Sequence, residues 1–299
     1  MRIASSQYSS TMNTALQTAN TKLSEVMQQM ASGKRILKPS DDTIATVRLA
    51  RLSREEAALD QYRTNIGALR SRLQTSEVTL DSLQQDLQVA RDLLVWAADG
   101  GNTPEDLQAM AGSLEALRNS LYYTANARDA EGHYLFSGTA TNQPTVTLVP
   151  GPPDVYGWGG NLGVQQVSVG DKITVDANVT LEGMGGFLTQ LDQLVTALKA
   201  PTVTAASVRG TVDLTLADLD ATMGTVGDRI SRLGGRQNML QTLEDNHGAV
   251  SLSNKQAALT LAQLDYGEAA VRMNRYTQAV QATQKSYAQV SQLSLFNAL

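Results

Sequence analysis

The 299-residue sequence contains no cysteine, only two histidines and few aromatic residues, which make up 5% of the chain. Without cysteine the protein can form neither a disulfide framework nor a thiolate metal site. His133 and His247 are far apart in the sequence, so the paired histidines of a zinc protease helix are missing. No set of base, nucleophile and metal ligands emerges. We therefore expect no catalytic residue, no cofactor and no metal site.

Basic residues are also scarce. The chain has 24 Lys and Arg against 29 Asp and Glu, and no basic run. Nucleic-acid binding needs clustered positive charge, and binding to a membrane surface needs a basic helix face, so both classes are excluded. The first twenty residues lack the apolar block of a secretory signal, and no later stretch is predicted to span a bilayer. We expect a cytoplasmic protein or one exported by another route.

Charge is absent from both ends of the chain, although both ends repeat apolar residues. No Asp, Glu, Lys or Arg occurs between Ile3 and Thr21, or between Ser286 and Leu299. The apolar residues here recur every three or four positions, which is the spacing of a coiled-coil seam. We predict that the two seams pair with each other and with neighbouring subunits. The predicted self-assembly residues are Met12, Leu16, Ala19, Leu23, Val26, Met30, Met273, Tyr276, Val280, Tyr287, Val290 and Leu293.

The strongest periodic pattern follows, in a predicted helix from about Asp42 to Ala97. At about 1.5 Å per residue this helix is about 80 Å long. A second predicted helix begins at the cap Thr103 and runs to about Asp129, and a third apolar stripe spans 212–240. We interpret these stripes as an intramolecular bundle core rather than an intermolecular seam. The predicted rod core comprises Ile66, Leu69, Leu73, Leu80, Leu83, Leu87, Leu94, Leu219, Met223, Val226, Ile230 and Leu233.

A glycine-rich segment, 132–186, separates the second and third stripes. Thr145–Val149 and Val167–Val175 have the β-branched residues of short strands, the latter around a Gly-Asp turn, whereas Gly157–Gly160 reads as a flexible turn. Phe187, Leu191, Leu194 and Leu198 predict a short return helix. The predicted fold is mainly α, an elongated helical coiled-coil bundle formed by the N- and C-terminal segments with a small β-rich domain inserted at the tip. The predicted domains are 1–40 with 252–299 (terminal assembly), 41–131 with 201–251 (rod) and 132–200 (tip).

Three motifs carry a resemblance to a known family. Met1-Arg2-Ile3 opens the chain, Ser32-Gly33-Lys34-Arg35-Ile36-Leu37 precedes Pro39-Ser40-Asp41-Asp42, and Tyr134-Leu135-Phe136-Ser137-Gly138 lies between rod and tip. Together with the ending Leu295-Phe296-Asn297-Ala298-Leu299, they resemble the flagellar hook-associated protein 3 (FlgL) family, the hook-filament junction proteins related to flagellin.

The resemblance implies a structural adaptor of the bacterial flagellum. It implies a homo-oligomeric ring between hook-associated protein 1 (FlgK) on the hook side and flagellin on the filament side. It also implies terminal helices that are disordered in the free monomer, a FlgN-like export chaperone, and export to the cell exterior by the flagellar type III system. Two alternatives stay open, a filament-forming flagellin and a coiled-coil surface adhesin. An enzyme is the weakest interpretation.

Overall fold

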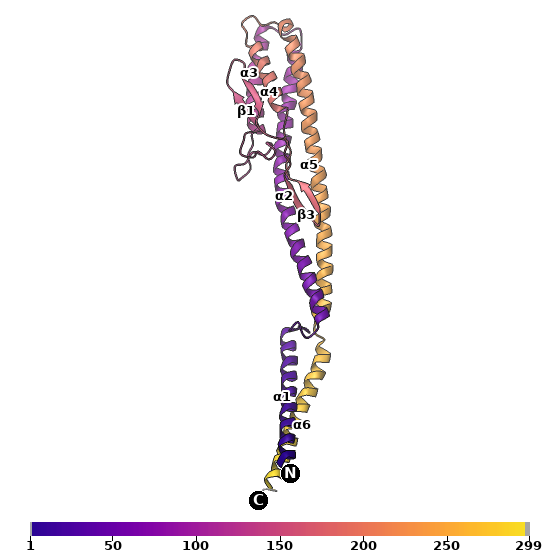
Figure 1. The fold of residues 1–299 in the computed structure, drawn as a ribbon. Helices are drawn as coiled ribbons and strands as arrows, with labels where there is room; N and C mark the ends of the chain where they lie inside the picture. Colours follow the sequence, from indigo (N-terminus) through magenta and orange to yellow (C-terminus); the bar gives the residue numbers. More distant parts are fainter. Residues whose placement is uncertain (1, 297–299) are drawn as a thin grey trace. The chain divides into compact units, whose positions relative to one another are not determined.

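A computed structural model describes residues 2–296, with side chains described for residues 7–289. Its described part is mainly helical (Figure 1). The segment of the chain that connects α3 to α4 forms two small antiparallel sheets. This confirms the predicted mainly α fold with a small β-rich insertion. In chain order the elements are α1 (Arg2–Ser32), α2 (Thr43–Ala97), α3 (Pro104–Ala125), β1 (Val146–Val149), β2 (Val155–Trp158), β3 (Gln166–Gly170), β4 (Ile173–Asp176), α4 (Met184–Leu198), α5 (Ala205–Ala262) and α6 (Tyr266–Phe296).

The chain divides into two compact units. Unit 1 comprises Met1–Ala58 and Ala249–Leu299, and unit 2 comprises Leu59–Gly248. Both long helices, α2 and α5, contribute to each unit, so the division falls inside helices rather than at loops. The predicted boundary between rod and tip lies within unit 2, where both parts share one hydrophobic core. The three-domain division therefore stays a prediction.

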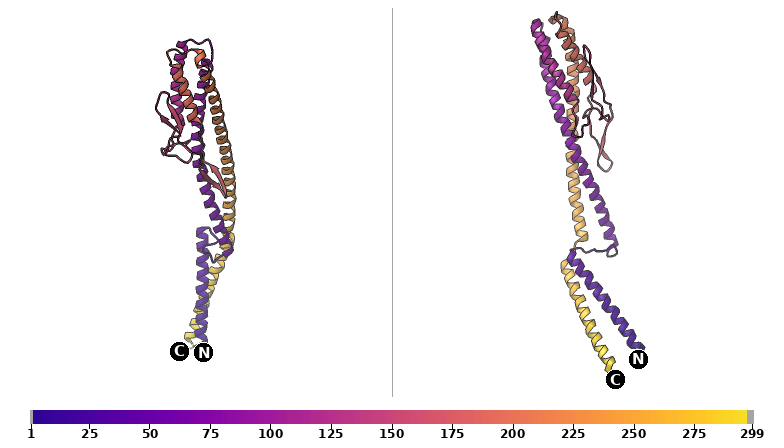
Figure 2. Two further views of the ribbon diagram at one scale, coloured as in Figure 1. Left: turned by 45° about the horizontal axis from the view of Figure 1, so that its top comes forward. Right: turned by 90° about the vertical axis from the view of Figure 1, so that its left-hand side faces the viewer.

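The core of unit 2 is a leucine-rich seam between α2 and its neighbours. Within this unit α2 and α5 lie side by side (Figure 2), and α3 and α4 pack against each other. Ion pairs cross from α2 to α5 at Arg70–Glu244 (2.6 Å) and Arg91–Asp220 (3.0 Å). All the predicted rod-core residues on α2 are at most 3% exposed, as are Leu219, Val226 and Leu233 on α5. Met223 and Ile230 are half-buried at its edge.

The second predicted helix is shorter than expected. We predicted an end near Asp129, but α3 ends at Ala125 because Asn126 turns the chain toward β1. The Asn126 side chain accepts a hydrogen bond from the Val146 backbone N–H (2.9 Å) and donates one to the Val146 carbonyl (3.0 Å). The start of α3 agrees with the sequence, since Thr103 and Asp106 form a reciprocal capping box ahead of Pro104.

The inserted segment supplies two hairpins. β1 pairs with β2, and β3 pairs with β4 around the turn at Asp171 and Lys172. Strands β1, β3 and β4 were predicted, but the flexible turn predicted at Gly157–Gly160 is wrong for Gly157 and Trp158, which lie in β2. Here Tyr156 donates its backbone N–H to the Thr189 hydroxyl of α4 (2.8 Å). The return helix is confirmed as α4, whose predicted apolar residues are at most 2% exposed.

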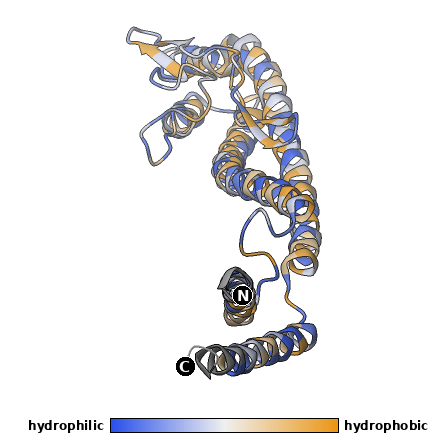
Figure 3. Ribbon diagram, turned by 60° about the horizontal axis from the view of Figure 1, so that its bottom comes forward, coloured by the Kyte–Doolittle hydropathy of each residue, from blue (hydrophilic) through white to orange (hydrophobic). Residues whose placement is uncertain are grey.

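Apolar and polar residues are interleaved along the coloured part of α6 (Figure 3). Within the described chain, no helix combines the length and the apolar character that a bilayer crossing requires.

Candidate assembly site

The two ends of the chain form one helix pair, α1 with α6, in unit 1 (Figure 1). Of the predicted seam residues on α1, Val26 is 4% exposed and the other five are half-buried. On α6, Met273, Tyr276 and Val280 are half-buried and Tyr287 is 43% exposed. Val290 and Leu293 lie outside the residues whose side chains are described. The seams therefore meet within one chain, but most of their side chains are only partly covered.

Among the residues whose side chains are described, the fully buried core of this pair is small and lies at one end. Val26, Leu264 and Ala269 form it, with Met30, Met273 and Tyr276 packed against them. Burying apolar surface is worth about 25 cal/mol per Å². Each half-covered seam residue would therefore gain further stabilisation if a neighbour covered its remaining apolar surface. The predicted rod-core leucines of α2 in unit 2 are at most 3% exposed, whereas most seam residues of the α1–α6 pair are only half-buried.

A groove of about 650 Å³ runs between α1 and α6. Small side chains dominate it and Lys22 is the one charged residue among its described lining residues, so another helix can approach closely without desolvating many charges. The lining residues are Ser10, Thr11, Thr14, Ala15, Thr18, Ala19, Lys22, Tyr276 and Ala279.

The threonines of the groove already have acceptors for their hydroxyl groups. Thr11, Thr14 and Thr18 each donate to the carbonyl four residues earlier, at 2.8–3.0 Å. A hydroxyl that keeps such a bond can be covered by a neighbour without the penalty for an unsatisfied donor. Sequence reasoning missed these residues. Their three- and four-residue spacing was visible, but we followed only apolar positions.

The connector between α1 and α2 is hydrogen-bonded to the end of α5 within unit 1. Gly33 ends α1 with a positive φ of 69° and its carbonyl accepts from Leu264 N–H (3.1 Å). Arg35 donates its backbone N–H to the Ala262 carbonyl (2.8 Å), and its guanidinium reaches Asp42 (3.0 Å) and the Leu261 carbonyl (3.2 Å). The motif Ser32–Asp42 thus holds the start of α2 beside the end of α5.

Asp41 and Asp42 act as caps and not as an acid pair, as the sequence indicates. Asp41 accepts from the N–H groups of Leu37 (2.9 Å) and Lys38 (2.8 Å), and Asp42 accepts from Ala45 N–H (2.9 Å). The pKa of Asp41 is lowered by the Lys38 and Leu37 amides, and that of Asp42 by the Ala45 amide and the Arg35 guanidinium. Both carboxylates are therefore held in their charged form by the connector.

The Tyr134–Gly138 motif is a packing element at the end of α3. Leu135 and Phe136 are at most 3% exposed, and the Leu135 N–H donates to the Ala127 carbonyl (3.0 Å). The Arg128 guanidinium lies over the Tyr134 ring, 4.3 Å from its centroid. Buried Ser137 donates its hydroxyl to the Ala140 carbonyl (3.0 Å). These contacts show that the motif packs the segment that follows α3.

Both histidines are engaged locally. His247 stacks on Tyr62 with ring centroids 5.7 Å apart, and its Nε2 lies 2.7 Å from the Val169 carbonyl. His133 lies 3.7 Å from the Asp129 carboxylate. In the part of the chain that the structure describes, no three His, Asp or Glu side chains gather as a metal site.

Comparisons with known proteins agree with these features. A sequence profile described as the bacterial flagellin N-terminal helical region matches residues 3–141. The chain is 32% identical to a solved structure described as that of a flagellar hook-associated protein from Vibrio parahaemolyticus, with a TM-score of 0.66. That match covers 74% of this chain and 99% of the other. The chain belongs to the flagellar hook-associated protein family.

Among the hook-associated proteins that match this chain in sequence, the type named is hook-associated protein 3. Flagellar hook-associated protein 3 of Escherichia coli strain K12 is 27% identical over 289 residues, with 90% of each chain covered. The flagellin of Listeria innocua is 23% identical over 286 residues, covering 91% of this chain and 88% of the other. The resemblance inferred from the sequence motifs is confirmed. The named relatives are thus a flagellar hook-associated protein and a flagellin.

Proposed function

We propose that the chain is a structural junction protein of the bacterial flagellum, joining the hook side to the flagellin filament through its terminal helices. One observation carries the proposal. The seam between α1 and α6 is left half-covered in a single chain, while unit 2 completes its own core. Apolar surface that one chain cannot cover is available for a neighbour. The match to hook-associated protein 3 over 90% of both chains supports the same assignment.

The partners of this site are proposed from the family. Copies of the chain form a ring, with hook-associated protein 1 (FlgK) below and flagellin above. Before assembly a FlgN-like chaperone holds the terminal helices, and the chain leaves the cell by the flagellar type III system. The absence of cysteine is compatible with this route, since no disulfide can block an unfolded chain from threading a narrow channel.

Two substitutions test the proposal. Leu16→Asp and Val280→Asp each place a charge in the half-buried seam. A charge there must be desolvated when a neighbouring helix covers it, and this penalty repeats in every copy of an assembly. We expect a folded unit 2 by circular dichroism and loss of filaments and motility in a strain that depends on this gene.

Gln85→Asp is the matched control, since it adds the same charge at an exposed position of α2 in unit 2. It should preserve filaments. Normal motility with Leu16→Asp and Val280→Asp, expressed at the level of the control, would contradict the proposal.

The second candidate is a filament subunit, because the chain also matches a flagellin along most of its length. A flagellin polymerises alone from short filament seeds, whereas a junction protein requires a hook end. Purified chain that elongates filament seeds by itself would favour the flagellin function. The higher identity to hook-associated protein 3 favours the junction function.

A further inference from the structure

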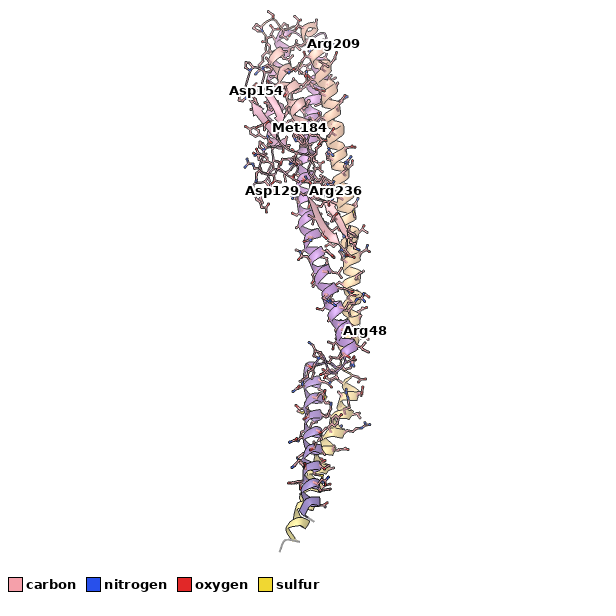
Figure 4. The ribbon with its side chains drawn as sticks, viewed as in Figure 1. Arg48, Asp129, Asp154, Met184, Arg209 and Arg236 are labelled. Atoms are coloured by element: carbon pink, nitrogen blue, oxygen red, sulfur yellow. The ribbon has the colours of Figure 1, made fainter. Side chains whose placement is uncertain are left out.

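Three arginines of α5 share one helix face in unit 2. Arg229, Arg232 and Arg236 are three and four residues apart, the spacing that places side chains on the same face. They line a hollow of about 280 Å³ together with residues of the 162–182 segment. Figure 4 shows Arg236 on α5, at the level of the β3–β4 hairpin.

Two carboxylates face these three guanidinium groups. Arg229 pairs with Glu182 (3.0 Å), and Arg236 pairs with Asp176 (3.1 Å) and also donates to the Asn178 carbonyl (2.9 Å). Arg232, which is exposed, has no hydrogen bond or ion pair among the described residues. The Nε of Arg229 is buried without an acceptor. The hollow therefore has one guanidinium in excess and one buried N–H that lacks a partner.

The charge balance favours an added anion. The pKa of Arg236 is lowered first by its burial and then by the positive charges of Arg232 and Arg229, while Asp176 opposes the shift. An oxyanion beside Arg232 offsets this repulsion and gives the Arg232 guanidinium an acceptor. Guanidinium groups bind carboxylates through two parallel N–H bonds, which suits this ligand class.

We propose that this arginine pocket binds a carboxylate side chain of a second copy of the chain. The volume admits an Asp or Glu side chain and is smaller than most pockets for organic ligands, which begin at about 300 Å³. Leu162 and Val164 at its rim are 64% and 54% exposed, which suits a protein neighbour better than a free ion. Unit 2 itself carries twenty-two Asp and Glu against twelve Lys and Arg, so neighbouring copies present carboxylates in excess.

This inference rests on the proposed assembly of copies side by side, but the pocket can be tested in the isolated chain. Purified full-length protein is titrated with sodium sulfate or sodium acetate, against sodium chloride at matched ionic strength, while the arginine Nε–H signals are followed by NMR. We expect saturable shifts at Arg229 and Arg232, and about tenfold weaker binding in Arg232→Gln, the change expected for losing a charged hydrogen bond. Arg63→Gln, an exposed arginine outside the pocket, is the control. Equal responses of Arg232→Gln and wild type would overturn the site.

Assembly in cells then tests the source of the carboxylate. Arg232→Glu should reduce filament number strongly, because two carboxylates then meet across the contact, whereas Arg63→Glu should not. Normal filaments with Arg232→Glu would overturn the contact between copies, even if sulfate binds. If the wild-type chain fails to support filaments, the junction function fails instead, and the sulfate titration still decides whether the pocket exists.

Discussion

At the scale of single residues, Gly138 shows how the Tyr134–Gly138 motif depends on glycine. Its φ is +75°, and a Cβ built there would lie 2.0 Å from the Asn161 carbonyl oxygen. Gly132 also has a positive φ, of 85°, but a Cβ there would meet no atom within 4 Å. The two positions therefore separate the cost of backbone conformation from the cost of collision.

We expect Gly138→Ala to lower the free energy of unfolding of unit 2 by about 3 kcal/mol, since strain and overpacking each cost about 1–3 kcal/mol. Gly132→Ala should cost only about 1–2 kcal/mol, the penalty for the left-handed conformation alone. Urea denaturation followed by circular dichroism measures both. Equal losses for the two variants would show that the close approach to Asn161 has no effect.

From the lowered pKa values of Asp41 and Asp42 we predict that the stability of the connector in unit 1 depends on pH. The pKa values of Asp41 and Asp42 are lowered in the folded chain. Their contribution to the stability of the folded connector is therefore fully present above the pKa of an unfolded aspartate, about 3.9. It is lost as the pH falls through the lower folded values. We expect the amide of Leu37 to lose protection from hydrogen exchange over that acid range. Asp41→Asn should remove this pH dependence, and an unchanged profile would contradict the capping role.

At the scale of elements, α3 and α4 are joined by a buried ion pair between Arg118 and Asp192, whose side chains are 10% and 6% exposed. Asp192 also accepts from the Asp154 N–H (2.7 Å), so it fixes the segment before β2. We expect Asp192→Ala to cost about 3–5 kcal/mol, because Arg118 loses the buried carboxylate that compensates its charge and keeps only the more distant Glu115 (3.7 Å) and the neutral Asn119 side chain as described partners. Thermal or urea unfolding measures the loss.

The comparison variant is Asp220→Ala, which breaks the exposed pair with Arg91. An exposed pair is worth at most about 1 kcal/mol. Similar losses for Asp192→Ala and Asp220→Ala would mean that burial of the α3–α4 pair is unimportant.

Local patterns predicted the helices well and the strands less well. Leu59–Leu94 and Phe187–Leu198 are periodic by themselves, so α2 and α4 follow from spacing alone. Strand β2 was missed because Gly157 interrupts its β-branched character, and its partners, β1 and Thr189 of α4, come from other parts of the chain. The apolar stripe predicted at 212–240 lies inside α5, which extends beyond it at both ends, from Ala205 to Ala262.

In the candidate site, too, local spacing predicted some residues and missed others. Half-buried seam positions on α1 and α6 follow from three- and four-residue steps. The Arg35 network could not be predicted, because its acceptor on α5, the Leu261 carbonyl, is 226 residues away. The arginine pocket was also missed, since its carboxylates come from the inserted segment and its arginines from α5. Non-local polar partners leave no trace in local spacing.

At the scale of the whole molecule, the two units differ in charge and in packing. Unit 1 carries twelve Lys and Arg against seven Asp and Glu, whereas unit 2 carries twelve against twenty-two. Unit 2 completes its core within one chain, and unit 1 does not. The chain therefore combines a self-sufficient unit with one whose stability is expected to depend on neighbours, as a protein that assembles at its ends requires.

Hydrogen exchange by mass spectrometry tests this dependence most directly. In the free chain we expect fast exchange before about Gly33 and after about Tyr266, and slow exchange along residues 60–94 of α2, because local opening is easiest where few apolar side chains are buried. In assembled flagella the same terminal segments should become protected. Slow exchange throughout α1 and α6 of the free, dilute chain, equal to that of the α2 core, would contradict the account.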